Sequence, residues 1–163
     1  MAQTIRVGMA DLAIAKAPDC LETLALGSCV AIVLYDPVVK IGGLAHAMLP
    51  DIHFASINAR DRVHKFVNTA IEVLVDQMVR HGVSIATIRA KLVGGANMFP
   101  GISANDVMHI GERNVQAARA QLVTLNIRIV AEQTGGSLGR SIHLDTQTGK
   151  LTMRTITHRG IEI

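Results

Sequence analysis

The sequence predicts one α/β (α+β) domain, a layered sandwich in which helices pack outside mixed or antiparallel β-sheets. Apolar residues recur at three- and four-residue steps from Ile57 to Gly82, which is typical of a helix with one buried face. Short runs rich in Val, Ile and Leu, bounded by turn residues, are typical of strands. These elements follow one another without a regular strand–helix–strand alternation, which favours layers of helix on sheet.

The first predicted strands, Ala31–Tyr35 and Ile41–Met48, flank a turn at Asp36–Val39. Asp in the first position and Pro in the second favour a type I turn. If the two ends of this turn pair with each other, Cys29 lies opposite His46, with the Cβ atoms about 5 Å apart. A bulge in the hairpin would shift that register by one residue.

The helical pattern predicts a long helix from about Ala59 to His81, and Gly82 is well placed to end it. Its apolar stripe is expected to face the core rather than to form a groove for a partner. A second helix is expected from Gly111 to Leu125, where apolar residues again fall on one side.

The later strands are expected at Lys91–Val93 and Ile127–Glu132, followed by a C-terminal hairpin. That hairpin runs from Ser141–Asp145 into Lys150–Ile156 through a turn at Thr146–Gly149. Several of the predicted strands are apolar throughout, so both of their faces should be covered. No linker, repeat or low-complexity segment interrupts the 163 residues, which are expected to form a single domain, 1–163.

Composition and charge narrow the function classes. The net charge is +3, but the basic residues are scattered and aromatic residues make up 2%, so no nucleic-acid partner is expected. The N-terminus does not resemble a signal peptide, and no apolar run reaches the roughly 18 residues that a membrane span needs. A cytoplasmic protein without membrane insertion and with reduced cysteines is therefore expected. The spacing of the two cysteines and seven histidines matches no metal motif, so no metal site is expected.

The predicted proximity of Cys29 and His46 suggests a chemical role for the pair. The thiolate is the reactive form of cysteine, and a neighbouring imidazolium lowers the thiol pKa, in favourable pairs to about 3 to 4. Such a pair is an activated nucleophile with its own acid for the leaving group. The alternative is a small buried cysteine beside a satisfied histidine. A third group would have to orient the imidazole, and spacing does not choose among the nearby candidates Thr23, Ser28, Asp36 and Asp51.

Several segments resemble the CheD family, the chemoreceptor glutamine deamidases of bacterial chemotaxis. The principal matches are Thr23–Val30, which contains Leu-Gly-Ser-Cys, and Gly43–Pro50, which contains Gly-Leu-Ala-His. The resemblance extends along nearly the whole chain. Val7–Ala10 resembles the opening strand of the family, Lys91–Phe99 its glycine-rich segment, Ile110–Val115 the start of its second helix, and Thr134–Gly136 with Arg140-Ser141 its later loop.

The resemblance implies a cysteine hydrolase with Cys29 as nucleophile, His46 as base and Thr23 as orienting residue. It implies conversion of receptor glutamines to glutamates through a cysteine thioester, hydrolysis of receptor glutamyl methyl esters in some relatives, and a fold similar to that of deamidating toxins. No cofactor is required. Donors for the oxyanion would be backbone or neutral groups, with the amides of Ser28 and Cys29 and the Ser28 hydroxyl as candidates and Gly27 as support.

Two details of the glycine pattern carry expectations. Ala25 stands where many relatives have glycine, so alanine would be strained there if the position needs a positive φ. The pairs Gly94-Gly95 and Gly135-Gly136 match neither phosphate-binding pattern and are expected to form turns.

The resemblance also implies an alternative function, because CheD proteins bind the CheC phosphatase and receptor tails. In that alternative the chain is a non-catalytic adaptor that binds receptors or a CheC-type phosphatase. The intact set of Thr23, Cys29 and His46 favours the enzyme.

Overall fold

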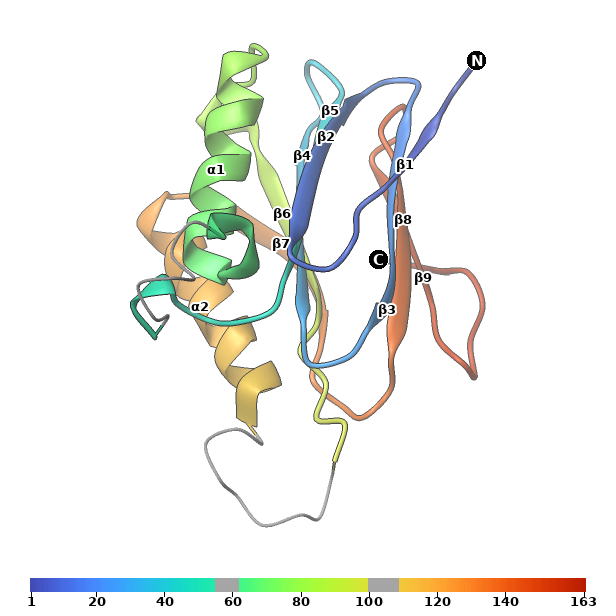
Figure 1. Cartoon of the computed structure of the whole chain (residues 1–163). Coiled ribbons are helices and arrows are strands. Elements are labelled where there is room, and N and C mark those ends of the chain that lie inside the picture. The colour runs from blue at the N-terminus through green and yellow to red at the C-terminus, as the bar shows by residue number, and fades with distance from the viewer. Residues whose placement is uncertain (55–61, 100–108) are drawn as a thin grey trace.

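The computed structural model describes residues 1–54, 62–99 and 109–163 and has three layers: a helix layer and two β-sheets (Figure 1). One sheet has the strand order β2-β5-β4-β6-β7, and the other β1-β3-β8-β9-β10. Both sheets are mixed, because β1 runs parallel to β3 and β6 to β7. This arrangement confirms the predicted fold class. None of the helices among these residues is long and apolar enough to cross a membrane.

The strands are β1 Thr4–Arg6, β2 Asp11–Lys16, β3 Cys20–Leu26, β4 Val30–Asp36, β5 Ile41–Ala47, β6 Arg89–Gly94, β7 Arg128–Thr134, β8 Arg140–Asp145, β9 Lys150–Arg154 and β10 Ile161–Glu162. The α-helices are α1 Val67–Arg80 and α2 Ile110–Thr124, and short 3₁₀ helices lie at Ile52–Phe54, Val63–Lys65 and Ile85–Thr87.

The central strand β4 is buried on both faces. Ile32 and Leu34 pack with the apolar side of α1, whereas Ala31 and Val33 face the second sheet. Burying one such aliphatic side chain contributes about 1.5–3 kcal/mol, so the hydrophobic effect holds the layers together. The expectation that apolar strands are covered on both faces is confirmed.

Two glycines in β5 let both neighbouring layers come close to this strand. A Cβ on Gly42 would lie 2.7 Å from Leu144 Cδ2 of the second sheet, and a Cβ on Gly43 would lie 2.9 Å from Leu74 Cδ1 of α1. Real Cβ atoms do not approach that closely, so larger residues here would force the layers apart. The same strand carries His46, which is therefore held in a tightly packed element.

The strands expected from the sequence are confirmed with ends that differ by a few residues, and so is the second helix. The resemblance, however, is wrong about Val7–Ala10, which does not form a strand but connects β1 with β2. Ala10 has a φ of 59°, and this left-handed conformation ends the extended chain. The sequence reading also missed β1, β2, β3 and β10.

The first helix is shorter than predicted. Residues 55–61 lie outside the described part, and the α-helix begins only at Val67, after a 3₁₀ turn. Phe66 is extended and forms a parallel bridge with Leu49, whose carbonyl accepts a hydrogen bond from Val67 N at 2.8 Å. This long-range pairing overrides the local helical pattern. Gly82, with a φ of 92°, follows the helix end as predicted.

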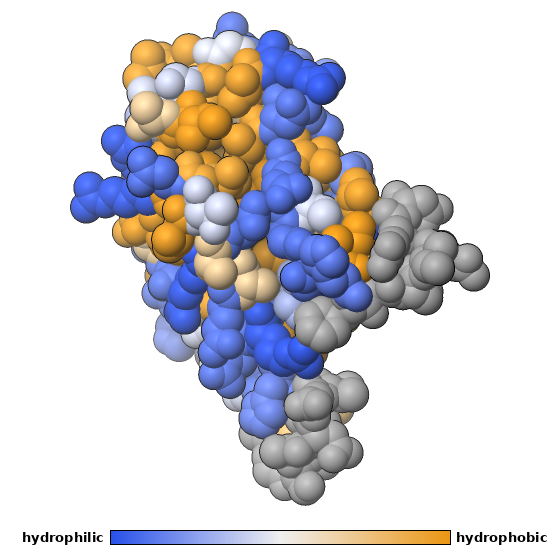
Figure 2. All heavy atoms as spheres, turned by 90° about the vertical axis from the view of Figure 1, so that its left-hand side faces the viewer, coloured by the Kyte–Doolittle hydropathy of each residue, from blue (hydrophilic) through white to orange (hydrophobic). Residues whose placement is uncertain are grey.

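The helix layer is seen face-on in Figure 2, where hydrophilic side chains lie among apolar surface. The apolar stripe of α1 is directed into the core, as predicted, with Ile71, Leu74 and Met78 fully buried. Val79 of α1 and Val123 of α2 are among the exposed apolar side chains of the molecule.

Candidate active site

The hairpin register differs from the prediction by two residues. Asp36 pairs with Ile41, so the loop has four residues, and Ala31 rather than Cys29 lies opposite His46. Asp36 Oδ1 accepts a hydrogen bond from Val38 N at 2.7 Å, which gives the expected aspartate turn, but the loop continues further. Four-residue loops built on a type I turn fit the twist of a hairpin better than two-residue type I loops.

A shift of two residues keeps every side chain on its predicted face, because strand side chains alternate with a period of two. Cys29 directly precedes β4 and packs with Ala31 and Val33 in the cluster between the sheets. His46 lies opposite Ala31 and therefore on the same face of the sheet as Cys29.

Thr23 and His46 meet between the two sheets. Thr23 on β3 is fully buried and His46 on β5 is 3% exposed. The Thr23 hydroxyl lies 2.7 Å from His46 Nδ1 and 2.7 Å from the carbonyl oxygen of Val7. Of the candidates that the sequence left open for orienting the imidazole, the structure brings Thr23 to it.

The two aspartates among those candidates have hydrogen-bond partners elsewhere. Asp36, at the far end of β4, accepts a hydrogen bond from the Thr87 hydroxyl at 2.7 Å. Asp51 accepts from the backbone and ring nitrogens of His53.

These contacts assign the histidine tautomer. The Val7 carbonyl can only accept, so the single Thr23 O–H proton is donated to it. The Thr23 oxygen must then accept from His46 Nδ1–H, and the lone pair of the imidazole resides on Nε2. Nε2 makes no hydrogen bond with the described residues. The imidazole is thus oriented as a base whose basic nitrogen, Nε2, has no hydrogen-bond partner in the described part of the chain.

Burial shifts the pKa values of both reactive groups toward their neutral forms. Burial raises the pKa of the Cys29 thiol above its ordinary value, and a hydrogen bond from the backbone N–H of the same residue only partly offsets this. Burial also lowers the pKa of His46. Both shifts run against the expectation of an imidazolium that keeps Cys29 as a thiolate.

Glycines support the backbone of Cys29 from the neighbouring strand. Gly95 N donates to the Cys29 carbonyl at 2.8 Å, and Ala96 N donates to the Gly27 carbonyl at 2.9 Å. Gly94 has a φ of 113°, and a Cβ there would collide with the Cys29 carbonyl oxygen. Gly94 ends β6 and Gly95 follows it without a turn, so the expected turn is not seen at this pair, and the positive φ values serve a close backbone approach instead.

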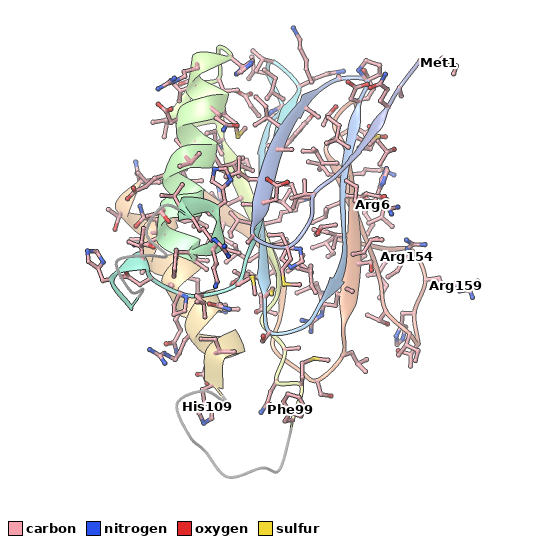
Figure 3. All side chains as sticks on the ribbon, viewed as in Figure 1. Met1, Arg6, Phe99, His109, Arg154 and Arg159 are labelled. Carbon is pink, nitrogen blue, oxygen red and sulfur yellow. The ribbon has the colours of Figure 1, made fainter. Side chains whose placement is uncertain are left out.

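The predicted supporting residues have backbone roles. Gly27 leaves room for Met98, whose Cγ would lie 3.3 Å from a Cβ at that position. The Ser28 carbonyl accepts a hydrogen bond from Asn114 Nδ2 on α2 at 3.0 Å. The β3–β4 connection that holds these residues lies at one end of the molecule (Figure 1), the end where Phe99 and His109 lie (Figure 3).

Sequence reasoning missed two parts of this site. Val7 contributes only a backbone carbonyl, which no residue pattern marks. Asn114 is fully buried although it is polar. It stands four residues before Ala118 on the apolar side of α2, and a polar residue on a buried helical stripe is a signal that the sequence offered.

The second cysteine, Cys20, and the strained position expected at Ala25 lie at opposite ends of β3. Cys20 begins β3, at the opposite end of that strand from the Cys29 connection, and its sulfur lies 4.0 Å from the Pro18 carbonyl. Ala25 has a φ of 57°, beside an irregularity in the pairing of β3 with β8, so this position does need a positive φ. Within the described ranges no group of three His, Cys, Asp or Glu residues could hold a metal ion.

Comparisons with known proteins agree with one another. The family model described as CheD chemotactic sensory transduction matches residues 48–155. The probable chemoreceptor glutamine deamidase CheD of Caldanaerobacter subterraneus is 47% identical, over 94% of this chain and 94% of that protein. The chemoreceptor glutamine deamidase CheD of Halalkalibacterium halodurans is 42% identical, over 98% of each chain. The crystal structure of Bacillus licheniformis hypothetical protein YfiH matches with a TM-score of 0.49 and 19% identity, over 76% of this chain and 50% of that one.

Proposed function

Because the chain belongs to the CheD family, we propose that it is a chemoreceptor glutamine deamidase, a protein-glutamine glutaminase that uses Cys29 as its nucleophile. The observation that carries the proposal is the contact of 2.7 Å between Thr23 and His46 Nδ1. It leaves Nε2 as the free base on the face of the sheet that Cys29 shares. The substrate is a glutamine side chain of a chemoreceptor, and the reaction takes place in the cytoplasm.

The first half of the reaction forms a thioester. His46 Nε2 takes the proton of the Cys29 thiol as the sulfur attacks the carboxamide carbon, so the neutral pair becomes charged only during attack. The C–N bond then breaks, and the imidazolium gives its proton to the departing ammonia. The buried imidazole favours its neutral form, which keeps the base available for each turnover.

The second half restores the enzyme. A water molecule gives a proton to His46 Nε2 and attacks the thioester carbon, and the C–S bond breaks. The products are a glutamate side chain and the Cys29 thiol, which recovers its proton from the imidazolium. Glutamine and water are thereby converted into glutamate and ammonia. The same steps with methanol as leaving group would hydrolyse a glutamyl methyl ester, which we propose as a second activity of this site.

Thr23 supports the base without a charge. The Thr23 oxygen accepts a hydrogen bond from His46 Nδ1–H, and the Thr23 hydroxyl donates its own proton to the Val7 carbonyl. A hydroxyl cannot offset the imidazolium charge as a carboxylate would, so its contribution is to hold the ring and its tautomer.

The second candidate function is an adaptor that binds receptors or a CheC-type phosphatase. Exposed apolar side chains beside the site favour a protein partner there: Met98 is 43% exposed and Phe99 is 63% exposed. Met98 contacts Gly27, two residues before Cys29. A surface that docks a protein serves either a substrate or a partner.

The deciding experiment compares Cys29→Ala with the wild type on a receptor cytoplasmic fragment. Mass spectrometry counts converted glutamines and an ammonia assay follows the rate. Cys29→Ala should abolish both signals while the circular dichroism spectrum is retained, and Cys20→Ala should leave both nearly unchanged. Equal conversion by the wild type and Cys29→Ala would leave the adaptor as the function.

A further inference from the structure

A buried asparagine joins the two segments that carry the nucleophile and the base. Asn114 of α2 is fully buried, and its Nδ2 donates to the Ser28 carbonyl at 3.0 Å and to the Met48 carbonyl at 2.9 Å. Ser28 directly precedes Cys29, and Met48 follows His46 by two residues. One side chain therefore fixes the separation of the two chain segments.

The orientation of the amide follows from its neighbours. Both partners are carbonyl oxygens, which only accept hydrogen bonds, so the NH₂ group must face them. The oxygen, Oδ1, is then buried without a hydrogen-bond partner among the described residues. An apolar side chain would avoid that cost. An asparagine in this position indicates that its two donors are needed.

The contact with Ser28 also sets the direction of the Cys29 amide. The Ser28–Cys29 peptide is trans, so its carbonyl and its N–H point in opposite directions. Because the carbonyl points to Asn114, the Cys29 N–H points away from α2. It has no backbone acceptor in the described parts of the chain and lies within hydrogen-bonding reach of its own sulfur. An N–H that has no backbone acceptor and lies beside the attacking sulfur can donate to the tetrahedral oxyanion once the sulfur has bonded to the substrate.

We propose that Asn114 is a positioning residue for the reaction. Its carboxamide turns the Cys29 N–H toward the developing oxyanion and holds the segment after His46 at a fixed distance from the nucleophile. The inference rests on the proposed deamidase function for its kinetic consequence, but its effect on the Cys29 thiol is independent of any substrate.

The kinetic test uses Asn114→Leu, which has a similar size and no donors. We expect kcat on a receptor fragment to fall about 10- to 100-fold, since removing an oxyanion donor outright costs about 10²–10³ and here the donor is only misdirected. KM should stay within about twofold, because the lost interaction forms in the transition state.

The matched control is Thr146→Val. Thr146 is also fully buried, and its hydroxyl also donates to a backbone carbonyl, that of Asp19. It lies at the other end of the sandwich, beside Tyr35, whose hydroxyl donates to the Thr146 carbonyl. This variant should lose stability on thermal unfolding while kcat stays near that of the wild type.

The substrate-independent test is the pH dependence of Cys29 alkylation, with Cys20 as internal reference and peptide mapping to separate the two. The Cys29 N–H stabilises the thiolate, so Asn114→Leu should move the Cys29 profile to higher pH, whereas Thr146→Val should leave it in place. If Asn114→Leu does not fold, Asn114→Ala, which also lacks donors, takes its place in both tests.

The two proposals fail in different ways. A wild-type protein that converts no receptor glutamine removes the deamidase function, and the alkylation profiles still test Asn114. A variant without donors that keeps the wild-type alkylation profile, and whose kcat falls no further than that of Thr146→Val, would overturn the positioning role.

Discussion

The two ends of the sandwich differ in how completely their buried polar groups are hydrogen-bonded. At the end distant from Cys29, Asp36 accepts from Val38 N and the Thr87 hydroxyl, and Thr146 both donates and accepts a hydrogen bond. At the reactive end, Asn114 Oδ1 has no partner among the described residues. An unmet buried acceptor costs about 1–3 kcal/mol. The buried polar groups of the distant end are therefore satisfied, whereas the end that holds Cys29 carries the cost of one unpaired buried acceptor.

The largest effect that tests this contrast is expected from His46→Ala. Removing the base should lower the deamidation rate by roughly 10⁴-fold or more, as losing a catalytic histidine does in other triads. Thr146→Val, at the end distant from Cys29, should lower the deamidation rate by less than about twofold in the same assay on a receptor fragment. A His46→Ala variant that retains more than a tenth of the wild-type rate would remove the histidine from the chemistry.

The next effect concerns Thr23→Val, which removes the hydroxyl while preserving shape. We expect a smaller loss than the roughly 10⁴-fold that follows the loss of a carboxylate orienter in a serine protease, because the hydroxyl sets the tautomer but carries no charge. Initial rates at saturating receptor fragment give the comparison. A loss as large as that of His46→Ala would contradict this ranking.

The folding of these elements explains which parts of the site could be predicted. The hydrophobic pattern was sufficient for β4, β5 and α2, and the CheD-like residues were sufficient for Thr23 and His46 as a contacting pair. The hairpin register failed because it depends on loop length, which the residues of the turn alone do not determine. The predicted register was wrong by two residues, an even number, so the side chains were still predicted on the correct face of the sheet.

Other parts were beyond a local reading. The strands β1 and β10 were missed because they have only three and two residues. β2 was missed because two half-buried positions follow each other in it, and β3 because one of its buried positions is polar, Thr23. Asn114 reaches carbonyls that lie 86 and 66 positions away in the sequence. Contacts of that range follow from the assembled layers and not from any window of sequence. The pKa shifts of Cys29 and His46 were unpredictable for a similar reason, because the burial that causes them depends on the closed sandwich.

The pH dependence follows from the neutral pair. The folded-state pKa of His46 lies below its ordinary value of 6.5 because the ring is buried. The unfolded chain therefore binds a proton that the native protein does not, so His46 contributes stability that is present above the unfolded pKa and is lost as pH falls toward the folded pKa. Activity should persist below pH 6.5 and fall only when the folded imidazole is protonated.

This pH effect can be measured by urea unfolding from neutral to mildly acidic pH. His46→Gln should flatten the dependence of the free energy of unfolding on pH. A wild-type stability that rises as pH falls through this range would contradict the burial argument.

The smallest expected effect compares one backbone position at each end. Ala25 lies in β3 near the end of the sandwich that holds Cys29, and Lys40 lies in the β4–β5 loop at the distant end. Both residues have a positive φ, of 57° and 55°. A residue with a Cβ is strained in this region by about 1–2 kcal/mol. Glycine relieves the strain but makes the unfolded chain more flexible. We expect Ala25→Gly and Lys40→Gly each to raise the free energy of unfolding by up to about 1 kcal/mol.

The control for this pair is Ala131→Gly in β7, which does not have a positive φ and should lose about 0.5–1 kcal/mol. Chemical unfolding of the three variants gives the ranking. The deamidation rate of Ala25→Gly should stay near that of the wild type, because Ala25 is exposed and the hydrogen bonds of Thr23 come from β5 and Val7. If Ala25→Gly loses stability as Ala131→Gly does, strain at this position does not limit stability. If Ala25→Gly changes the deamidation rate while Lys40→Gly does not, the irregularity in the pairing of β3 with β8 influences the reaction.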